Sequence, residues 1–386
     1  MKALFYNSKR IGEDNIIWGL LELGIEVDRS ELVLDLDLIF DDQVEKIEEE
    51  IREYDFVITR NFSVNAAEAC HVEGIPYISW CYDSPLLALY SKEALYSTNY
   101  VFVFDKMHLL RLKDMGLKHV YYQPLAANII KAGQVTITDD DLKKYACDIS
   151  FVGGMYYKRY FDIFKKEMNV DDIEECEKMF ERHLCKWDKG SSIMDELPSS
   201  VINVLYSKMS KEDRDLYSIS DRYLVERLIL VIELTSRERF KLLNESARNF
   251  DTIVHTHEPE KIKGLLEARL EPPVKELSDE LYRIYAAAKI NLNITMRSIE
   301  TGIPQRVFDI MSVGGCVFSN YQEEAEELFE PDKEIVLFKS LEEFKEKAEY
   351  YLSHENELLN IGARGYLKVR DKYNYAVSLR NIISKI

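Results

Sequence analysis

A repeated alternation of short β-rich runs with helical patterns constrains the fold of this chain more than any other feature of its sequence. Apolar residues recur either in short continuous runs or at helical intervals. In the first part, the predicted strands are residues 2–7, 31–36, 55–59, 75–80, 100–104 and 119–123, and the predicted helices are 13–23, 41–54 and 106–115. Strands that alternate with helices favour a parallel sheet covered by helices on both faces. We therefore expect an N-terminal Rossmann-like domain over residues 1–125.

The same alternation starts again after a polar connection over residues 126–146. The run "DISFVGG" is typical of a buried strand that leads into a glycine turn, and it opens a second Rossmann-like domain, expected at 147–370. Its further predicted strands are residues 251–256, 289–295, 316–320 and 334–338, and its predicted helices include 279–288 and 304–313. Residues from about 161 to 249 are mostly helical and predict a helical insertion in this domain. A C-terminal helix is expected within residues 371–386.

Length, charge and cysteine usage exclude several classes of protein. A chain of 386 residues is too long for one typical core, so two domains are expected. The net charge of -19 would repel a nucleic-acid backbone, and no cluster of Lys or Arg with aromatic residues offsets it. The sequence has neither the apolar run of a signal peptide nor about eighteen consecutive apolar residues, so we expect a cytoplasmic protein without a membrane-spanning segment. The six scattered cysteines predict neither a disulfide framework nor a zinc site.

The stretch Ile290–Asn320 carries the clearest functional signal. It is a predicted strand, a loop and a short helix, and in an open α/β sheet such a loop lies at the carboxyl end of its strand, where ligands bind. The helix start offers unpaired backbone N–H groups, which suit a phosphate oxygen. Arg297 and Arg306 add guanidinium groups that match a diphosphate, and Asp309 could accept hydrogen bonds from sugar hydroxyls. The alternative is that Arg306 and Asp309 pair with each other on a solvated helix face.

Other candidates follow the ends of predicted strands. Asp83 could serve as a base for an acceptor hydroxyl, or it could simply begin a turn or cap a helix. His255, with His257 two residues later, could reach the base or the phosphates of a nucleotide, or could be a hydrogen-bonded strand end. The residues at 7–10 could touch an acceptor or form an ordinary solvated turn.

Two acidic runs contain closely spaced aspartates, and the pattern Asp-x-Asp holds a divalent ion in some metal-dependent enzymes. Asp35 and Asp37 fit the solvated face of an alternating strand, and Asp139–Asp141 fits the start of a helix. We therefore predict no obligatory metal, with the arginines doing the electrostatic work of a cation.

Three stretches resemble one protein family. "NLNITMRSIETGIPQRVFDIMSVGGCVFSNYQEEAEELFEPDKEIVLF", with "YISWCYDSP" and "CDISFVGGMYYKR" before it, is similar to the bacterial CgeB-like glycosyltransferases. The resemblance implies a GT-B fold, in which two Rossmann-like domains face each other across a cleft. The first domain would take the acceptor and the second would hold the nucleotide-sugar donor, and the C-terminal helix would cross back to the first domain.

The resemblance also implies roles for particular residues. Arg297 and Arg306 would be the donor-phosphate cations, and Asp309 would bind the ribose. The backbone cradle for the phosphates would be Thr301, Gly302 and Ile303, and the glycine turn near the donor would be Gly153 and Gly154. The position eight residues before Asp309 is Thr301, which departs from the paired glutamates of many retaining enzymes and leaves the stereochemistry open.

The expected activity is transfer of a sugar from a nucleoside-diphosphate sugar, a UDP-sugar above all, to a hydroxyl of a protein or glycan acceptor. No cofactor is expected, and the oligomeric state stays open. Two alternatives remain: a nucleotide-sugar epimerase or hydrolase on the same fold, and a non-catalytic surface-assembly protein that only binds.

Overall fold

The computed structural model describes residues 1–7, 12–34, 39–157, 161–187, 199–207, 223, 225–257 and 259–386. Of the candidates above, the segment 8–10 and the acid pair Asp35 and Asp37 lie outside these residues.

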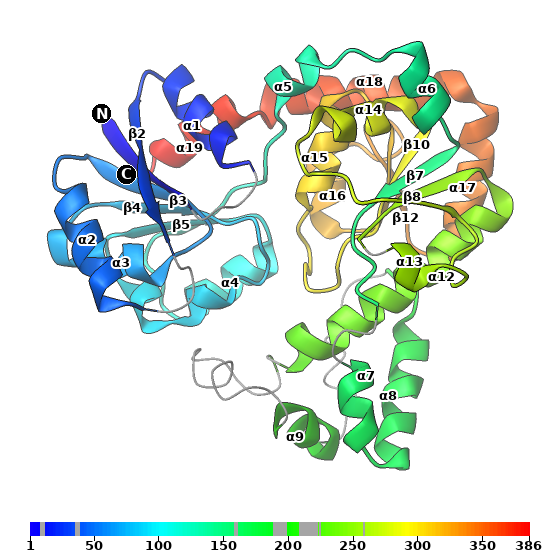
Figure 1. The fold of residues 1–386 in the computed structure, drawn as a ribbon, viewed down its shortest axis with the longest axis horizontal. Coiled ribbons are helices and arrows are strands. Elements are labelled where there is room, and N and C mark those ends of the chain that lie inside the picture. The colour runs from blue at the N-terminus through cyan, green and yellow to red at the C-terminus, as the bar shows by residue number, and fades with distance from the viewer. Residues whose placement is uncertain are drawn as a thin grey trace.

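Two parallel six-stranded sheets form the framework of the molecule (Figure 1). The first sheet has the order β2-β1-β3-β4-β5-β6. Its strands are β1 Lys2–Asn7, β2 Glu26–Val33, β3 Phe56–Arg60, β4 Tyr77–Trp80, β5 Asn99–Val103 and β6 Val120–Tyr122. Its helices are α1 Glu13–Glu22, α2 Asp41–Ile51, α3 Val64–Glu73 and α4 Lys106–Asp114. The strand order reverses between β1 and β3, and open α/β sheets bind ligands at such a switch point.

The second sheet has the order β12-β11-β10-β7-β8-β9, with its switch point between β7 and β10. Its strands are β7 Ile149–Val152, β8 Thr252–His255, β9 Arg269–Glu271, β10 Ile290–Asn293, β11 Val317–Asn320 and β12 Val336–Phe338. The helices around it are α5 Ile129–Gln134, α6 Asp139–Tyr145, α13 Pro259–Ile262, α14 Asp279–Ala287, α15 Gln305–Ser312, α16 Glu323–Leu328, α17 Leu341–Ser353 and α18 Glu355–Lys372. Two α/β domains with all-parallel sheets make up the α/β two-domain fold expected from the sequence.

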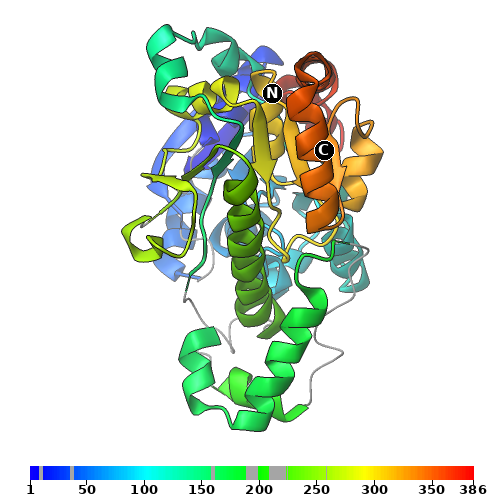
Figure 2. The same cartoon turned by 90° about the vertical axis from the view of Figure 1, so that its right-hand side faces the viewer.

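The helical segment between β7 and β8 projects from the second domain (Figures 1 and 2). Its described helices are α7 Phe161–Phe164, α8 Val170–His183, α9 Ser199–Ser207 and α12 Val231–Asn249, with a π-helical turn Glu226–Leu230 leading into α12. These helices bury their own apolar cluster, which includes Phe161, Phe180 and Leu234. The far end of α12 joins the core of the second sheet through Leu242 and Leu243.

The chain crosses between the domains twice, and the two crossings touch. The backbone N–H of Ala127, after β6, donates to the carbonyl of Tyr373 at 2.7 Å, just after α18. The last helix, α19 Tyr375–Ile383, then lies on α1 of the first domain (Figure 1). Its residues Tyr375, Leu379 and Ile382 are buried together with side chains from β1, β3 and α1.

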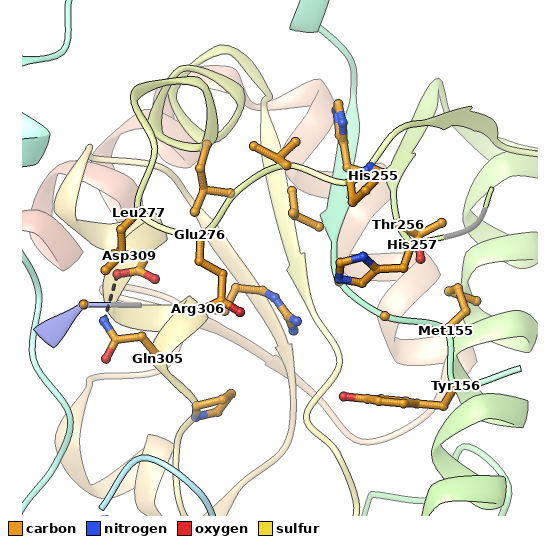
Figure 3. A pocket seen from close by; sticks show the side chains of 18 of the residues that line it. Met155, Tyr156, His255, Thr256, His257, Glu276, Leu277, Gln305, Arg306 and Asp309 are labelled. Atoms are coloured by element: carbon orange, nitrogen blue, oxygen red, sulfur yellow. Dashed lines mark hydrogen bonds between the residues drawn. The ribbon is translucent and has the colours of Figure 1, made fainter. Parts of the chain in front are cut away.

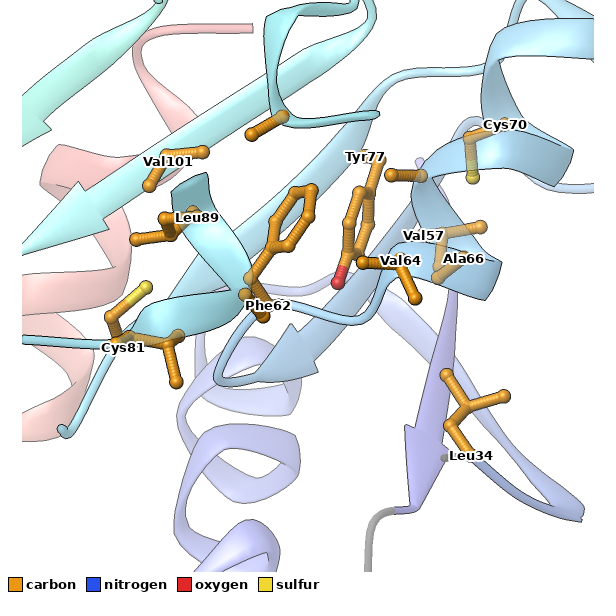
Figure 4. Packing of buried hydrophobic residues seen from close by; sticks show 14 of the residues in the cluster. Leu34, Val57, Phe62, Val64, Ala66, Cys70, Tyr77, Cys81, Leu89 and Val101 are labelled. Carbon is orange, nitrogen blue, oxygen red and sulfur yellow. The ribbon is translucent and has the colours of Figure 1, made fainter. Parts of the chain in front are cut away.

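The core of the first domain on the other face of its sheet lies under α2 and α3 (Figure 4). Val57, Phe62 and Tyr77 are fully buried there, and Phe62 and Tyr77 pack with ring centroids 5.6 Å apart. This rigid packing fixes the strand ends, from which the loops of the site emerge.

Several elements differ from the sequence-based expectation, among them β2, α3 and β9. β2 begins at Glu26 rather than at residue 31. The sequence did not predict this start because "EVDRSELV" is largely polar and gives no apolar run. α3 was not predicted from spacing, since its alanine-rich sequence is buried on most sides and lacks a single apolar stripe. β9, a short and partly exposed edge strand, was also not predicted.

Candidate functional site

A cavity of about 1210 Å³ lies where the carboxyl ends of the two sheets face each other. The first domain lines it with Gly12, Arg60, Tyr82 and Asp83. The second domain contributes residues that include 152–157, 255–257, 273, 274, 276, 277, 304–306 and Asp309, and α19 contributes Tyr375. Arg60 ends β3, beside the switch point of the first sheet, and the segments 152–157 and 304–306 follow the two strands of the second switch point. The cavity therefore lies at the switch points of both sheets, where open α/β sheets bind ligands.

Arg306 and Gly153 are in direct contact in the second-domain wall. A Cβ atom on Gly153 would lie 2.6 Å from Nη2 of Arg306, so only glycine leaves room for the guanidinium against the backbone. The guanidinium also lies over the ring of Phe151, 5.2 Å from its centroid, and Nη1 donates to Oδ1 of Asn293 at 2.9 Å. Within the described ranges no carboxylate forms an ion pair with Arg306. Its guanidinium therefore points into the cavity, which Glu276 and Asp309 also line (Figure 3).

A second arginine, Arg239 of α12, lies behind the same turn, and sequence reasoning missed it. One of its Nη atoms donates to the carbonyl of Gly154 and the other donates to the carbonyl of Ile294 at 2.8 Å. Its guanidinium lies 5.4 Å from the centroid of Phe151, on the ring that Arg306 also covers. Burial, assisted by the charge of Arg306, lowers the pKa of Arg239 to about 10. Two guanidinium groups thus gather at the glycine turn, an arrangement that an anion would stabilise.

Asp309 lies one turn into α15 and points toward the first domain. Its carboxylate accepts a hydrogen bond from Nε2 of Gln305 at 2.8 Å (Figure 3), and Gln305 Nε2 also donates to the carbonyl of Ala126 at 2.9 Å. Burial raises the pKa of Asp309 to about 7, although Arg60 and Arg306 act in the opposite direction. No ion pair joins Asp309 to Arg306 in the described part of the chain, so the alternative of a pair on a solvated face does not apply.

His255 ends β8 and anchors the glycine turn through its backbone. The carbonyl of His255 accepts a hydrogen bond from the N–H of Gly153 at 2.9 Å. Its ring lines the cavity with Thr256 and His257 (Figure 3), and Nδ1 lies 3.4 Å from the carbonyl oxygen of Pro272. Burial lowers the pKa of this imidazole, which favours its neutral form. The structure thus brings His255 together with Gly153, Gly154 and Arg306.

Asp83 lies in the opposite wall, just past β4. Its Oδ2 accepts a hydrogen bond from Nδ2 of Asn61 at 2.7 Å, and the backbone N–H of Tyr82 donates to the Asn61 side-chain oxygen, also at 2.7 Å. Asn61 is fully buried and adopts a left-handed backbone with φ of 64°, which suits asparagine better than most residues. Asn61, which sequence reasoning also missed, thus fixes the orientation of the Asp83 carboxylate.

Arg297 is not at the cavity, contrary to the expectation from sequence. Its Nε and Nη2 atoms donate to the carboxylate of Glu238 on α12 at distances from 2.6 to 3.1 Å, and Nη2 also donates to the carbonyl of Lys186 at 2.7 Å. The side chain of Glu238 is fully buried. Arg297 therefore neutralises a buried carboxylate and ties the loop after β10 to the helical segment.

The loop Thr301–Ile303 also differs from the expected phosphate cradle, because it docks on the first domain. Thr301 Oγ1 lies within hydrogen-bond distance of the carboxylates of Asp105, at 3.0 Å, and Glu324, at 2.7 Å, and its single hydrogen is donated to one of them at a time. A Cβ on Gly302 would lie 2.6 Å from the carbonyl oxygen of Phe104, and Ile303 is buried in the core. The helix start reaches the cavity only from Pro304 onward, which is the N-cap of α15.

The domain interface at this loop is rich in polar contacts. Asp105 caps α4 and also accepts from the backbone N–H of Glu300 at 2.8 Å, while Glu324 accepts from the N–H of Lys106 at 2.7 Å. Arg111 forms an ion pair with Glu300. Burial raises the pKa of Glu324 to about 7. These contacts hold the two domains together beside the cavity.

In the described ranges, no helix combines the length and the apolar character that a bilayer crossing requires. No group of three or more His, Cys, Asp or Glu side chains there is placed to hold a metal ion.

Residues 245–384 match a family model described as "Glycosyl transferase-like". No curated protein matches the chain in sequence. Among solved structures, HepE from Anabaena in complex with UDP and glucose is 12% identical with a TM-score of 0.54, covering 100% of this chain and 98% of its own. A glycosyltransferase from Rickettsia africae is 11% identical with a TM-score of 0.58, covering 99% and 97%. An alpha-glucosyltransferase in complex with UDP and a DNA 13-mer is 9% identical with a TM-score of 0.57, covering 100% and 99%.

At these identities the likeness concerns the architecture. It confirms the fold expected from the sequence: the protein has a GT-B fold, with two α/β domains and a helical insertion in the second.

Proposed function

We propose that this protein is a glycosyltransferase that moves a sugar from a UDP-sugar to an acceptor hydroxyl and belongs with the CgeB-like enzymes. One observation carries the proposal: the guanidinium of Arg306 lies against Gly153 in a cavity between the domains, with Arg239 behind the same turn and no carboxylate paired to Arg306 in the described ranges. The family match to residues 245–384 supports it. So do two of the proteins with similar folds, whose structures are complexes with UDP.

In this proposal Arg306 and the start of α15 bind the diphosphate, and the positive charge stabilises the negative charge that grows on the departing UDP. The bond between the sugar C1 and the diphosphate oxygen breaks, and a bond from C1 to the acceptor oxygen forms. Asp83 receives the acceptor proton or orients the hydroxyl that loses it. Asp309 accepts hydrogen bonds from donor hydroxyls, and His255 contacts the nucleotide. Because arginine supplies the charge, transfer without an added divalent metal is part of the proposal.

The first test compares Arg306→Ala with wild type in UDP binding by titration calorimetry and in UDP release from a panel of UDP-sugars and glycan or protein acceptors. Removing a donor that acts on the transition state slows turnover by about 100- to 1000-fold. UDP affinity should fall as well, with the melting temperature nearly unchanged. Arg248→Ala, which breaks an exposed ion pair with Glu267, is the matched control and should behave as wild type.

Asp83→Asn in the same assays separates chemistry from binding, because the amide keeps the size of the carboxylate but is not a base. We expect unchanged UDP affinity and a rate loss of about 100-fold or more. Wild-type protein that fails to bind UDP or any UDP-sugar refutes the proposed function. Rapid UDP release without an acceptor points instead to a hydrolase, and activity lost on chelation contradicts the metal-independent reading.

A further inference from the structure

Among the described residues that line the first-domain wall, Arg60 is the cation, and the proposed reaction has not used it. It ends β3 at the switch point of the first sheet and lines the cavity. Within the described residues none of its N–H groups donates to a protein acceptor, no ion pair engages it, and its Nε is buried without a partner. A desolvated donor without an acceptor is costly, so an arginine in this state is explained most simply by a ligand that supplies the acceptor.

The surroundings of Arg60 hold it in place without an ion pair, and the Asp309 carboxylate is near enough for Arg60 to lower its pKa. The guanidinium lies 4.3 Å from the centroid of Tyr82, and the Tyr82 hydroxyl bonds to the hydroxyl of Tyr375 on α19 at 3.1 Å. Gly12 lies on another side, where an added Cβ would be 3.5 Å from Nη1 of Arg60. The carboxylate of Asp83 is engaged by Asn61, and that of Asp309 by Gln305. A fixed aromatic platform with no paired carboxylate leaves the planar donor fork available to an oxyanion.

The position of Arg60 assigns this oxyanion to the acceptor rather than to the donor. Arg306 and the glycine turn belong to the second-domain wall, whereas Arg60 shares the first-domain wall with Asp83. β3 and β4 are adjacent parallel strands, and Arg60 is paired in register with Trp80, three residues before Asp83. A group bound by Arg60 therefore lies beside the carboxylate that would take the acceptor proton.

Building on the proposed function, we infer that the acceptor is anionic: it carries a phosphate or a carboxylate close to the hydroxyl that is glycosylated, and Arg60 binds that group. With an overall charge of -19 the protein repels anions in general, so binding an anionic acceptor requires a local cation such as Arg60. A neutral hydroxyl could accept from only part of the Arg60 fork and would not balance its charge, so a neutral acceptor would bind more weakly.

The test uses protein saturated with UDP, so that the donor site is occupied, and titrates it with inorganic phosphate in a calorimeter. Wild type should bind phosphate, and Arg60→Ala should weaken that binding by about 10- to 100-fold, the range expected for charge-assisted hydrogen bonds. Arg60→Lys should recover part of it. Arg52→Ala, which removes a surface arginine of the first domain paired with Glu73, is the matched control and should bind phosphate as wild type does.

A second arm distinguishes the two anionic groups with three small hydroxyl compounds: glycerol phosphate, lactate and glycerol. The preferred probe identifies phosphate or carboxylate, and glycerol should not bind. Phosphate that binds Arg60→Ala as tightly as wild type overturns the inference, as does phosphate that fails to bind the UDP-saturated wild type or a preference for glycerol. UDP affinity is measured in the same titrations: its absence refutes the proposed function, whereas intact UDP binding with any of these results refutes only the role of Arg60.

Discussion

At the residue scale, the site depends on Gly153, because its missing side chain lets the guanidinium of Arg306 approach the backbone. Gly153 and Arg306 could each be singled out from local sequence patterns, one as a turn after a strand and the other as a cation at a helix start. Their contact could not be predicted, because the two residues lie on different strand–loop units. Spacing alone also could not show that Arg306 lines the cavity and Arg297 does not. The partner of Arg297, Glu238, is 59 positions away in the helical segment.

Gly153→Ala should therefore impair the site through Arg306. The new Cβ would lie 2.6 Å from Nη2 of Arg306 and 3.1 Å from the ring of Phe151, so the guanidinium must move away from the turn. We expect UDP affinity to fall by roughly tenfold or more, the cost of losing one good charge-assisted hydrogen bond. Calorimetric titration with UDP measures it.

Gly154→Ala is the matched control, because its Cβ would meet only the ring of Tyr156 at 3.7 Å, an ordinary contact. Equal loss of affinity in both variants would show that the turn itself, rather than the position of Arg306, is what UDP binding needs.

At the element scale, the parallel strands were predictable because buried strands of this type read as short apolar runs. The edge strands β2 and β9 and the buried helix α3 carry no such signal. The loop after β10 was the least predictable element. It was expected to hold phosphates with Arg297 and with the backbone of Thr301–Ile303, but tertiary partners on α12 and at the N-cap of α4 hold Arg297 and Thr301 instead.

Arg297→Ala should destabilise the second domain rather than abolish nucleotide binding. It leaves Glu238 as a buried carboxylate without its cation, and breaking a buried pair by removing one partner costs about 3 kcal/mol or more. Chemical unfolding measures this loss, and UDP titration of the folded variant should give nearly wild-type affinity.

The double variant Arg297→Met with Glu238→Gln removes both charges and should recover part of the stability. An Arg297→Ala protein with unchanged stability and no UDP binding would instead restore the phosphate role that the sequence suggested.

At the scale of the whole molecule, the two-domain architecture follows from the doubled strand–helix rhythm, and the solved GT-B structures confirm it. The relative placement of the domains could not be read from the sequence. It depends on contacts such as Thr301 with Asp105 and Glu324, which join residues 196 positions apart in one case.

This interface should make stability depend on pH. The pKa of Glu324 is raised from 4.5 to about 7 in the folded protein, so the folded state holds a proton that the unfolded chain releases earlier. Its contribution to stability is complete below about pH 4.5 and is lost as the pH rises through 7. The pKa of Asp309 is also raised, so its contribution to stability is likewise lost as the pH rises. Melting temperatures at pH 5.5 and 8 should therefore differ, with the higher value at pH 5.5.

Glu324→Gln should reduce that difference, because its amide oxygen still accepts from Lys106 and Thr301 but carries no charge. Glu326→Gln on the same helix, at an exposed position, is the control. A pH dependence that is identical in wild type and Glu324→Gln would contradict this account of the interface.

The helix α19 fills the core of the first domain, although β1 to β6 are encoded long before it. During synthesis on the ribosome, α19 cannot cover the apolar face formed by Ala3, Phe5 and Ile16 until the entire second domain has been made. We therefore expect the half of the protein that is synthesised first to complete its core last, with this apolar face accessible to a chaperone during translation.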